Sequence, residues 1–307
     1  MTTLSRFRGC LLGLACGDAV GTAVEFCPPG SFPLETDMAG GGPFDLPVGA
    51  WTDDTSMALC LATSLVERGC FDPKDQMERY LRWLQQGYFS STGRCFDIGI
   101  TTRLALSRFQ ETGEPYAGDT DIISAGNGSI MRLGPVPLFY YADEEAAIRW
   151  AGESSRTTHG TLECVESCQL LAAMIHTALM GRTKDEVLFG SVPSRYQSPK
   201  VQAIAAGAYR SKTIDLIKGT GYVIDCLEAS AWCFWQTSNW KDAVLQAVNL
   251  GDDADTTGAV CGQLAGAFYG EEAIPAEWLN RLVMAKEIGR LAERLLGPKH
   301  VFGAVKR

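Results

Sequence analysis

Two segments of this chain carry a glycine at every fourth position. The first series is Gly9, Gly13, Gly17 and Gly21, and the second is Gly258, Gly262, Gly266 and Gly270. Residues four apart share one face of an α-helix, so each series predicts a glycine stripe along a helix. A glycine inside a helix costs roughly 1 kcal/mol relative to alanine, and close approach of another helix backbone is the usual compensation. We therefore expect two central helices that pack tightly against their neighbours.

Acidic residues argue against a membrane setting for these stripes. Asp18 and Glu25 interrupt the first segment, and Gly270-Glu271-Glu272 breaks the second one. A membrane-spanning helix needs about 20 predominantly apolar residues. The stripes therefore predict close helix contacts inside a globular protein.

Helical periodicity dominates the rest of the chain, and alternating strand patterns are scarce. Apolar residues recur at spacings of three and four, which predicts helices over 55–68, 74–84, 144–152, 161–179, 201–210, 222–235 and 278–296. The breaks between these segments are too short to be interdomain linkers. We expect an all-α protein that forms a single domain over residues 1–307.

Composition limits the partners and the compartment. The net charge is -9 and no basic patch stands out, which disfavours binding to nucleic acid or to an anionic membrane. The eleven cysteines are scattered without a C-x-x-C pair, which is typical of buried small side chains in a reducing compartment. We expect a cytoplasmic protein and a monomer.

The first acidic motif is Trp51-Thr52-Asp53-Asp54-Thr55, just before a predicted helix. Asp and Thr are favoured helix N-caps, and acids in the first turn complement the helix dipole. For this motif taken alone, capping and metal binding are about equally well supported.

The second acidic motif, Gly251-Asp252-Asp253-Ala254-Asp255-Thr256-Thr257, holds more acid than capping requires. Like charges this close repel one another unless a cation lies among them. Carboxylate and hydroxyl oxygens favour a hard ion such as Mg²⁺ or Mn²⁺ over Zn²⁺. If the two motifs meet in the fold, they supply enough oxygen ligands for two adjacent ions.

The chain resembles the ADP-ribosylglycohydrolase family. It is most similar to the bacterial dinitrogenase reductase-activating glycohydrolase branch of that family, which removes ADP-ribose from arginine. Six motifs carry the resemblance in order: Arg8-Gly9 through Gly17-Asp18-Ala19 to Glu25, Trp51 to Thr55, Cys95-Phe96-Asp97-Ile98-Gly99, Ala125-Gly126-Asn127-Gly128-Ser129-Ile130-Met131-Arg132, Thr158-His159, and Gly251 to Thr256. The resemblance implies an orthogonal all-α bundle with two Mg²⁺ or Mn²⁺ ions.

The resemblance also implies site residues. Glu25 and Asp253 are the expected catalytic residues, and Glu25 would orient or deprotonate the attacking water. The implied metal ligands are Thr52, Asp53, Asp54, Asp253, Asp255 and Thr256. The implied substrate-binding residues are Phe96, Asp97, Gly126, Asn127, Gly128, Ser129 and His159. From the residues alone, Glu25 is explained as an acid at a helix end, and Asn127-Gly128 as a turn. A single histidine such as His159 is usually structural.

The expected reaction is metal-dependent hydrolysis at the anomeric carbon of the ribose distal to adenine, on an ADP-ribosylated protein or conjugate. Arginine is the expected leaving group; serine, poly(ADP-ribose) and O-acetyl-ADP-ribose are alternatives, as is a sensor that binds ADP-ribose without cleaving it. A prenyl-diphosphate enzyme would need acids at Met57 and Cys261, where none stands.

Overall fold

The computed structural model describes residues 1–297, and those residues form helices and no strand. This confirms the all-α prediction. The α-helices are α1 (Thr3–Gly21), α2 (Asp53–Arg68), α3 (Pro73–Gln86), α4 (Ile100–Thr112), α5 (Pro135–Phe139), α6 (Glu144–Arg156), α7 (Leu162–Leu179), α8 (Lys184–Phe189), α9 (Pro199–Ala205), α10 (Val223–Gln236), α11 (Trp240–Val248), α12 (Ala254–Tyr269), α13 (Ala276–Arg281) and α14 (Ala285–Leu296).

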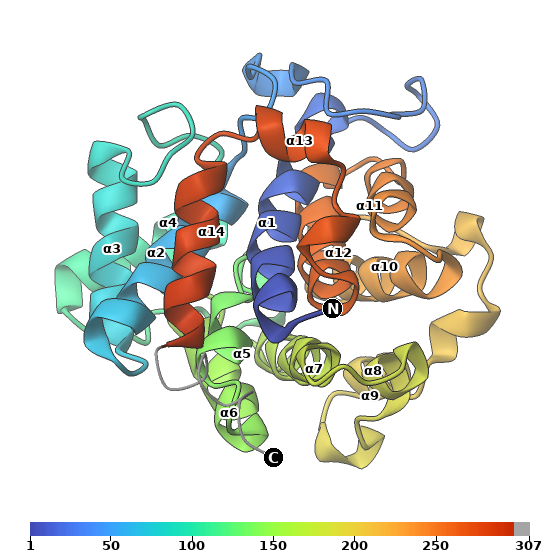
Figure 1. Cartoon of the computed structure of the whole chain (residues 1–307). Coiled ribbons are helices and arrows are strands. Elements are labelled where there is room, and N and C mark those ends of the chain that lie inside the picture. The colour runs from blue at the N-terminus through green and yellow to red at the C-terminus, as the bar shows by residue number, and fades with distance from the viewer. Residues whose placement is uncertain (298–307) are drawn as a thin grey trace, which may run out of the picture.

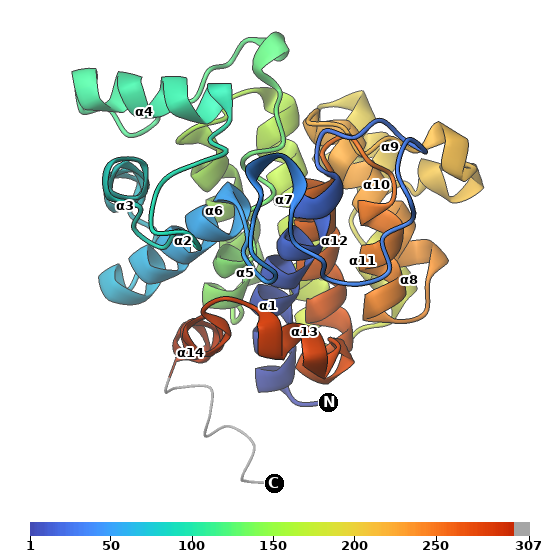
Figure 2. The ribbon, with the colours of Figure 1, turned by 90° about the horizontal axis from the view of Figure 1, so that it is seen from above.

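The two glycine-striped helices, α1 and α12, lie side by side at the centre of the molecule (Figures 1 and 2). Their stripes face each other in antiparallel register. A Cβ atom built on Gly9, Gly13 or Gly17 would lie 2.4, 2.3 or 2.1 Å from the carbonyl oxygen of Gly266, Gly262 or Gly258, respectively. Real Cβ atoms do not come that close, so only glycine permits this contact. The predicted tight packing is confirmed, and each stripe is the other's partner.

The remaining helices surround this pair. In both ribbon views α14 and α2 lie to one side of α1, and α10 and α11 lie on the other side next to α12 (Figures 1 and 2). One contiguous apolar core runs from Phe7 of α1 to Leu296 of α14. By length and composition α1 could cross a membrane, but 89% of its most apolar stretch is buried inside the molecule.

Two predicted helices differ from the structure. The helix expected over 278–296 is two helices, α13 and α14, because Met284 adopts a left-handed φ of 56° and the amide of Val283 donates to the carbonyl of Gly49 instead. The helix expected over 201–210 ends at Ala205, since Gly207 has a φ of 72°. The apolar periodicity continues across both breaks, so periodicity alone predicts an unbroken helix in each case.

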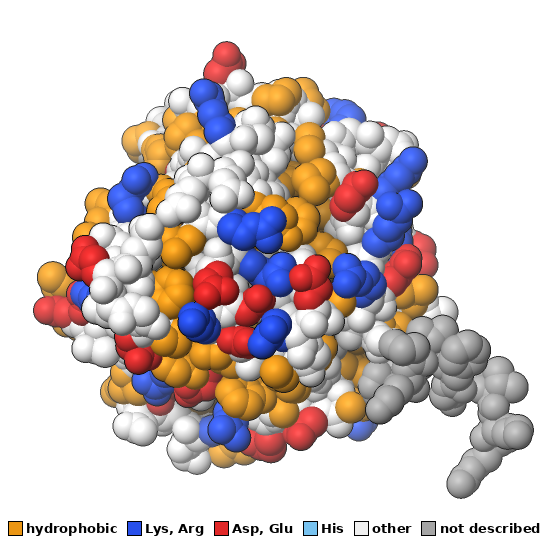
Figure 3. Space-filling view, turned by 90° about the vertical axis from the view of Figure 1, so that its left-hand side faces the viewer, with side chains coloured by type: hydrophobic (Ala, Val, Ile, Leu, Met, Phe, Trp, Pro, Cys, Tyr) orange, Lys and Arg blue, Asp and Glu red, His pale blue; other side chains and the backbone are white. Residues whose placement is uncertain are grey.

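The burial of the cysteines and the distribution of surface charges are as the sequence predicted. Eight of the eleven cysteines are buried and all eleven are free, as expected for small core side chains. On the face seen in Figure 3, Lys and Arg side chains are interspersed with Asp and Glu rather than gathered into one patch. Among the salt bridges of the described residues, that between Arg68 and Asp72 joins two such charges four residues apart.

Candidate active site

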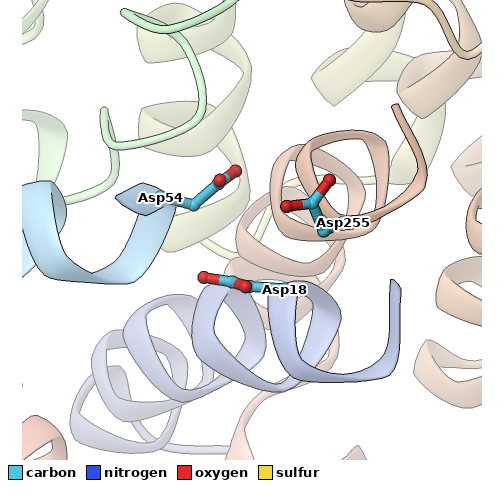
Figure 4. A group of neighbouring side chains, drawn as sticks. All are labelled: Asp18, Asp54 and Asp255. Atoms are coloured by element: carbon cyan, nitrogen blue, oxygen red, sulfur yellow. The ribbon is translucent and has the colours of Figure 1, made fainter. Parts of the chain in front are cut away.

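Three helix ends meet at one acidic centre. They are the C-terminal half of α1 with Asp18, the N-terminus of α2 with Asp54, and the N-terminus of α12 with Asp255 (Figure 4). The antiparallel glycine register explains the meeting, since a Cβ atom on Gly21 would lie 2.3 Å from the Cα of Asp255. The two acidic motifs, about two hundred residues apart in sequence, therefore lie together as the sequence suggested.

Asp18 fixes the start of α2. One of its oxygens accepts the amide of Thr52 at 2.9 Å, and the other accepts the amide of Thr55 at 3.1 Å and its hydroxyl at 2.6 Å. These are the bonds that a capping side chain would make, supplied here from another helix. Capping therefore does not account for Asp53 and Asp54, and neither Thr52 nor Asp253 caps its own helix with its side chain.

The hydroxyl of Thr52 reveals an excess of acceptors. Its oxygen lies 3.0 or 3.1 Å from one oxygen of each of three carboxylates, those of Asp18, Asp54 and Asp255. A hydroxyl has a single proton and can donate to only one of them. The other contacts bring lone pairs together and are repulsive unless a cation or an extra proton lies between them.

Buried carboxylate oxygens without hydrogen-bond partners surround the same point. They are Oε2 of Glu25, Oδ1 of Asp54 and Oδ1 of Asp255. Unpartnered buried oxygens are costly. Two groups of acids have oxygens within 4.8 Å of one another: Asp18 with Asp54 and Asp255, and Glu25 with Asp97 and Asp255.

These two groups share Asp255 and consist only of oxygen donors. Such a donor set fits hard divalent cations, and a shared carboxylate is the arrangement expected between two neighbouring ions. The hydroxyl of Thr256 lies 3.4 Å from Asp54 and adds a further oxygen. The residues present therefore fit the divalent ions that the sequence predicted.

The electrostatics of the cluster point the same way. Burial, followed by the negative charge of Asp97, raises the pKa of Glu25 to about 10. Burial and the charge of Asp253 raise the pKa of Asp97 to about 8. Burial raises the pKa of Asp18 to about 6 against the hydrogen bonds that lower it. Without a cation these groups hold protons that free carboxyls would have lost.

A cavity of about 240 Å³ opens beside the acids. Among the predicted site residues, its lining includes Glu25, Asp53, Asp97, Gly126, Asn127, Gly128, His159, Asp253, Asp255 and Thr256. Asn127 also donates from Nδ2 to Asp253 at 2.8 Å, which fixes the orientation of that carboxylate. The cavity therefore joins the acidic centre to the glycine loop at 126–128.

Four predicted site residues lie outside this lining. Thr52 and Asp54 are fully buried beneath the cavity, where they contact the other acids. The hydroxyl of Ser129 is buried 2.9 Å from that of Ser155, and the thiol of Cys168 donates to it. Phe96 packs against Phe44 and lines a neighbouring hollow of about 480 Å³. Ligand contacts of Ser129 and Phe96 thus stay predictions that this geometry does not support.

Left-handed backbone occurs at two residues that line the cavity, Phe26 and Asp97, and at Asp252, next to the lining residue Asp253. Phe26, Asp97 and Asp252 have φ values of 62°, 57° and 54°, a left-handed conformation that side chains with a Cβ rarely adopt. The amide of Phe26 donates to the carbonyl of Asp252 at 2.7 Å, and the amide of Asp252 donates to Cys27 at 2.8 Å. These two hydrogen bonds hold the Glu25 segment against the second acidic motif. Two of the strained residues therefore flank Glu25 and Asp253, which are predicted site residues.

Sequence reasoning gave Asp18 no role in the site. Its side chain is fully buried and contacts Thr52 and Thr55. The available signal was its position, a single acid within the otherwise apolar first glycine stripe. An acid on such a buried face needs partners.

Comparisons with known proteins concern the sequence and the overall fold. A sequence profile described as ADP-ribosylglycohydrolase matches residues 1–301. The chain is 46% identical to the ADP-ribosylarginine hydrolase Tri1 of Pseudomonas putida (strain GB-1) over 95% of this chain and 78% of that protein. It is 34% identical to the ADP-ribosyl-dinitrogen reductase glycohydrolase of Rhodospirillum rubrum over 95% of each. A solved structure titled ADP-ribosylglycohydrolase-related protein complex superposes with a TM-score of 0.86 at 43% identity, over 96% of this chain and 98% of that one.

Proposed function

This chain belongs to the ADP-ribosylglycohydrolase family, and from that membership we propose that it hydrolyses the glycosidic bond between ADP-ribose and an arginine side chain. The observation that carries the proposal is the acidic cavity, which joins the shared-aspartate cluster to the glycine loop. Relatives at 46% and 43% identity are named ADP-ribosylarginine hydrolases. The enzyme would therefore reverse mono-ADP-ribosylation of arginine.

We further propose two Mg²⁺ or Mn²⁺ ions at the acidic centre. Their ligands would come from Thr52, Asp53, Asp54, Asp253, Asp255 and Thr256, with Asp18, Glu25 and Asp97 close by. When bound, such ions supply Lewis acidity that polarises ligand oxygens and lowers the pKa of water. The orphaned oxygens of Asp54 and Asp255 support this assignment.

Glu25 is positioned to move the proton of the attacking water. Its carboxyl is 4% exposed, lines the cavity and leaves Oε2 without a partner. The water oxygen forms a bond to the anomeric carbon while the bond from that carbon to the guanidine nitrogen breaks. Glu25, ionised when the charge of the acidic centre is compensated, takes the released proton at Oε2 and passes it to the nitrogen of the departing guanidine. The carboxylates of Asp97 and Asp253 stabilise positive charge that develops on the ribose.

The other cavity residues would position the substrate. Gly126 and Gly128 line the cavity, and their lack of a side chain leaves room for the ring of His159, since a Cβ atom on Gly128 would lie 2.7 Å from Cε1 of that ring. Asn127 holds Asp253 in place from the same loop. An excess of carboxylates also attracts a cationic guanidinium more strongly than a serine hydroxyl or an acetyl group, which favours arginine as the leaving group.

A panel of conjugates tests this function. Peptides with ADP-ribose on arginine or on serine, and O-acetyl-ADP-ribose, would be incubated with Mg²⁺, with Mn²⁺ or with excess EDTA. Release of ADP-ribose from the arginine conjugate, abolished by EDTA and restored by either metal, is the expected result. Binding of the arginine conjugate without release contradicts the hydrolase proposal, and full activity in EDTA contradicts the metal assignment.

A further inference from the structure

Arg132 is a fully buried cation without an acidic partner among residues 1–297. It follows the glycine loop and donates from Nη1 to the carbonyl of Gly128 at 3.0 Å. Its guanidinium lies 4.7 Å from the centre of the Tyr80 ring. Burying a charge without an acidic partner is costly, so other contacts of Arg132 must compensate for that cost.

The second contact of Arg132 begins a chain of hydrogen bonds. Its Nη2 donates to Oγ1 of Thr158 at 2.7 Å, and that oxygen lies 2.8 Å from Nδ1 of His159. A guanidinium can only donate, so the threonine oxygen accepts from it. Thr158 is fully buried, and these are the two contacts of its hydroxyl within the described part of the chain.

The proton of the Thr158 hydroxyl then has one place to go. A buried hydroxyl proton without an acceptor is costly, and Nδ1 of His159 is the acceptor in reach. Nδ1 must therefore carry a lone pair. Burial, followed by the positive charge of Arg132, lowers the pKa of His159 to about 3, so the ring is neutral near neutral pH and its single proton is on Nε2.

Nε2 lies at the cavity. His159 is among the residues that line it, and Nε2 makes no hydrogen bond within residues 1–297. The ring edge rests against the glycine loop, since a Cβ atom on Gly128 would lie 3.0 Å from Nε2 and one on Gly126 would lie 3.4 Å from it. The unused N–H therefore borders the space where a ligand of the 126–128 loop would lie.

We propose that Arg132 and Thr158 are positioning residues that lock His159 as the Nε2–H tautomer, so that it donates to an acceptor oxygen of the bound ADP-ribose unit. The inference rests on the proposed function only for the identity of that ligand. The other tautomer would turn a lone pair toward the same oxygen and repel it. The buried charge of Arg132 thereby serves to orient the hydroxyl of Thr158 and keep the imidazole neutral.

The tautomer is read directly by nuclear magnetic resonance. The full chain, labelled with ¹⁵N histidine and free of ligand, gives few imidazole signals because it has three histidines. Two-bond ¹H–¹⁵N correlations distinguish a protonated ring nitrogen from one with a lone pair. We expect His159, assigned by its loss in His159→Gln, to be neutral with the proton on Nε2. A charged His159 ring, or a proton on its Nδ1, in the spectrum of the parent chain overturns the proposal.

Thr158→Val tests the relay because valine has the shape of threonine without the hydroxyl. We expect protonation of Nδ1 to become populated, and kcat/KM on the arginine conjugate to fall roughly tenfold as one hydrogen bond is lost. Thr158→Ser, which keeps the hydroxyl, should restore both readouts. His176, whose Nε2 lies 3.0 Å from the carbonyl of Tyr141, is the internal reference that should not change.

The outcomes separate the relay from the enzymatic function. An unchanged His159 tautomer in Thr158→Val overturns the relay, whatever happens to the rate. Because the spectrum is recorded without substrate, a chain that failed to release ADP-ribose would still report the tautomer. Arg132→Met provides a second variant: if it folds, it should raise the pKa of His159, and an unchanged titration curve contradicts the role given to the buried charge.

Discussion

Asp255 is the residue on which the acidic centre depends most, because it belongs to both groups of clustered carboxylates. Asp255→Asn preserves the shape of the side chain and removes its charge. We expect the rate on the arginine conjugate to fall on the order of a hundredfold or more. In EDTA near pH 8 the same variant should be more stable than the parent, since one of several repelling charges is gone. Rate assays and thermal unfolding measure the two effects.

Asp252→Asn is the matched control for that variant. Asp252 is the neighbouring acid, but it is in neither cluster and its left-handed φ of 54° suits asparagine. Its rate and metal response should stay close to those of the parent. If Asp255→Asn were as active as Asp252→Asn, the shared-carboxylate site would be wrong.

Glu25 is expected to act on the rate rather than on binding. Glu25→Gln keeps the size of the side chain and its polarity but cannot take a proton. We expect kcat to fall by about 10²- to 10⁴-fold, the usual contribution of a positioned acid or base, while calorimetry shows ADP-ribose binding within a few-fold of the parent. Loss of binding with an unchanged kcat would instead make Glu25 a ligand contact only.

At the residue scale, the sequence predicted most acids of the site and missed how they are held. Asp253 and Asp255 stood out because capping needs fewer acids than that motif contains. Asp18 gave only a weak signal because its hydrogen bonds to Thr52 and Thr55 connect two helices. The inward rotation of Ser129 toward Ser155 depends on packing that no local pattern records.

At the scale of elements, the glycine stripes predicted tight packing but not the identity of the partner. Spacing fixes the face of a helix on which the glycines lie. It does not state that Gly13 meets Gly262 in antiparallel register. The break between α13 and α14 was missed for a similar reason, since the amide of Val283 leaves the helix to pair with distant Gly49.

Gly13→Ala tests the register. The new Cβ atom would lie 2.3 Å from the carbonyl oxygen of Gly262, and a backbone atom cannot move aside as a side chain can. We expect a loss of at least about 3 kcal/mol in the free energy of unfolding, or failure to fold. Denaturant unfolding measures the change.

Gly152→Ala in α6 is the helical control. Its nearest atom would be Nε2 of Gln169 at 2.9 Å, the end of a flexible side chain that can rotate away. Alanine also favours the helix by about 1 kcal/mol, so the net change in unfolding free energy should be within about 1 kcal/mol. Equal losses in the two variants would show that the α1–α12 contact is not specially tight.

At the scale of the whole molecule, the packing that forms the site also creates its repulsion. The α1–α12 register brings Asp18 beside Asp255, and Asp18 in turn fixes α2 with Asp54. A fold that gathers these acids in a buried place stores unfavourable charge, which either protons or cations can neutralise. Stability should therefore depend on pH in a way that divalent metal removes.

The direction of that dependence follows from the raised pKa values. The pKa of Asp18 is about 6, that of Asp97 about 8 and that of Glu25 about 10 in the folded chain, against ordinary values of 3.8 for Asp and 4.5 for Glu. The folded state therefore binds more protons than the unfolded state between about pH 4 and pH 8, so its stability falls as pH rises. In EDTA we expect the melting temperature to decrease from about pH 5 to about pH 8.

Saturating Mg²⁺ should largely abolish this decrease, because the ion competes with protons for the same oxygens and binds only the folded chain. The stabilisation by metal should thus grow with pH and be smallest near pH 5. Sodium chloride at equal ionic strength is the control for general screening. Stability in EDTA that rose toward pH 8 would mean that the buried acids are already neutralised by the protein itself. A stabilisation by metal that did not change with pH would place the ion away from these carboxylates, because metal binding depends on pH only where the ion displaces protons from the carboxyl groups.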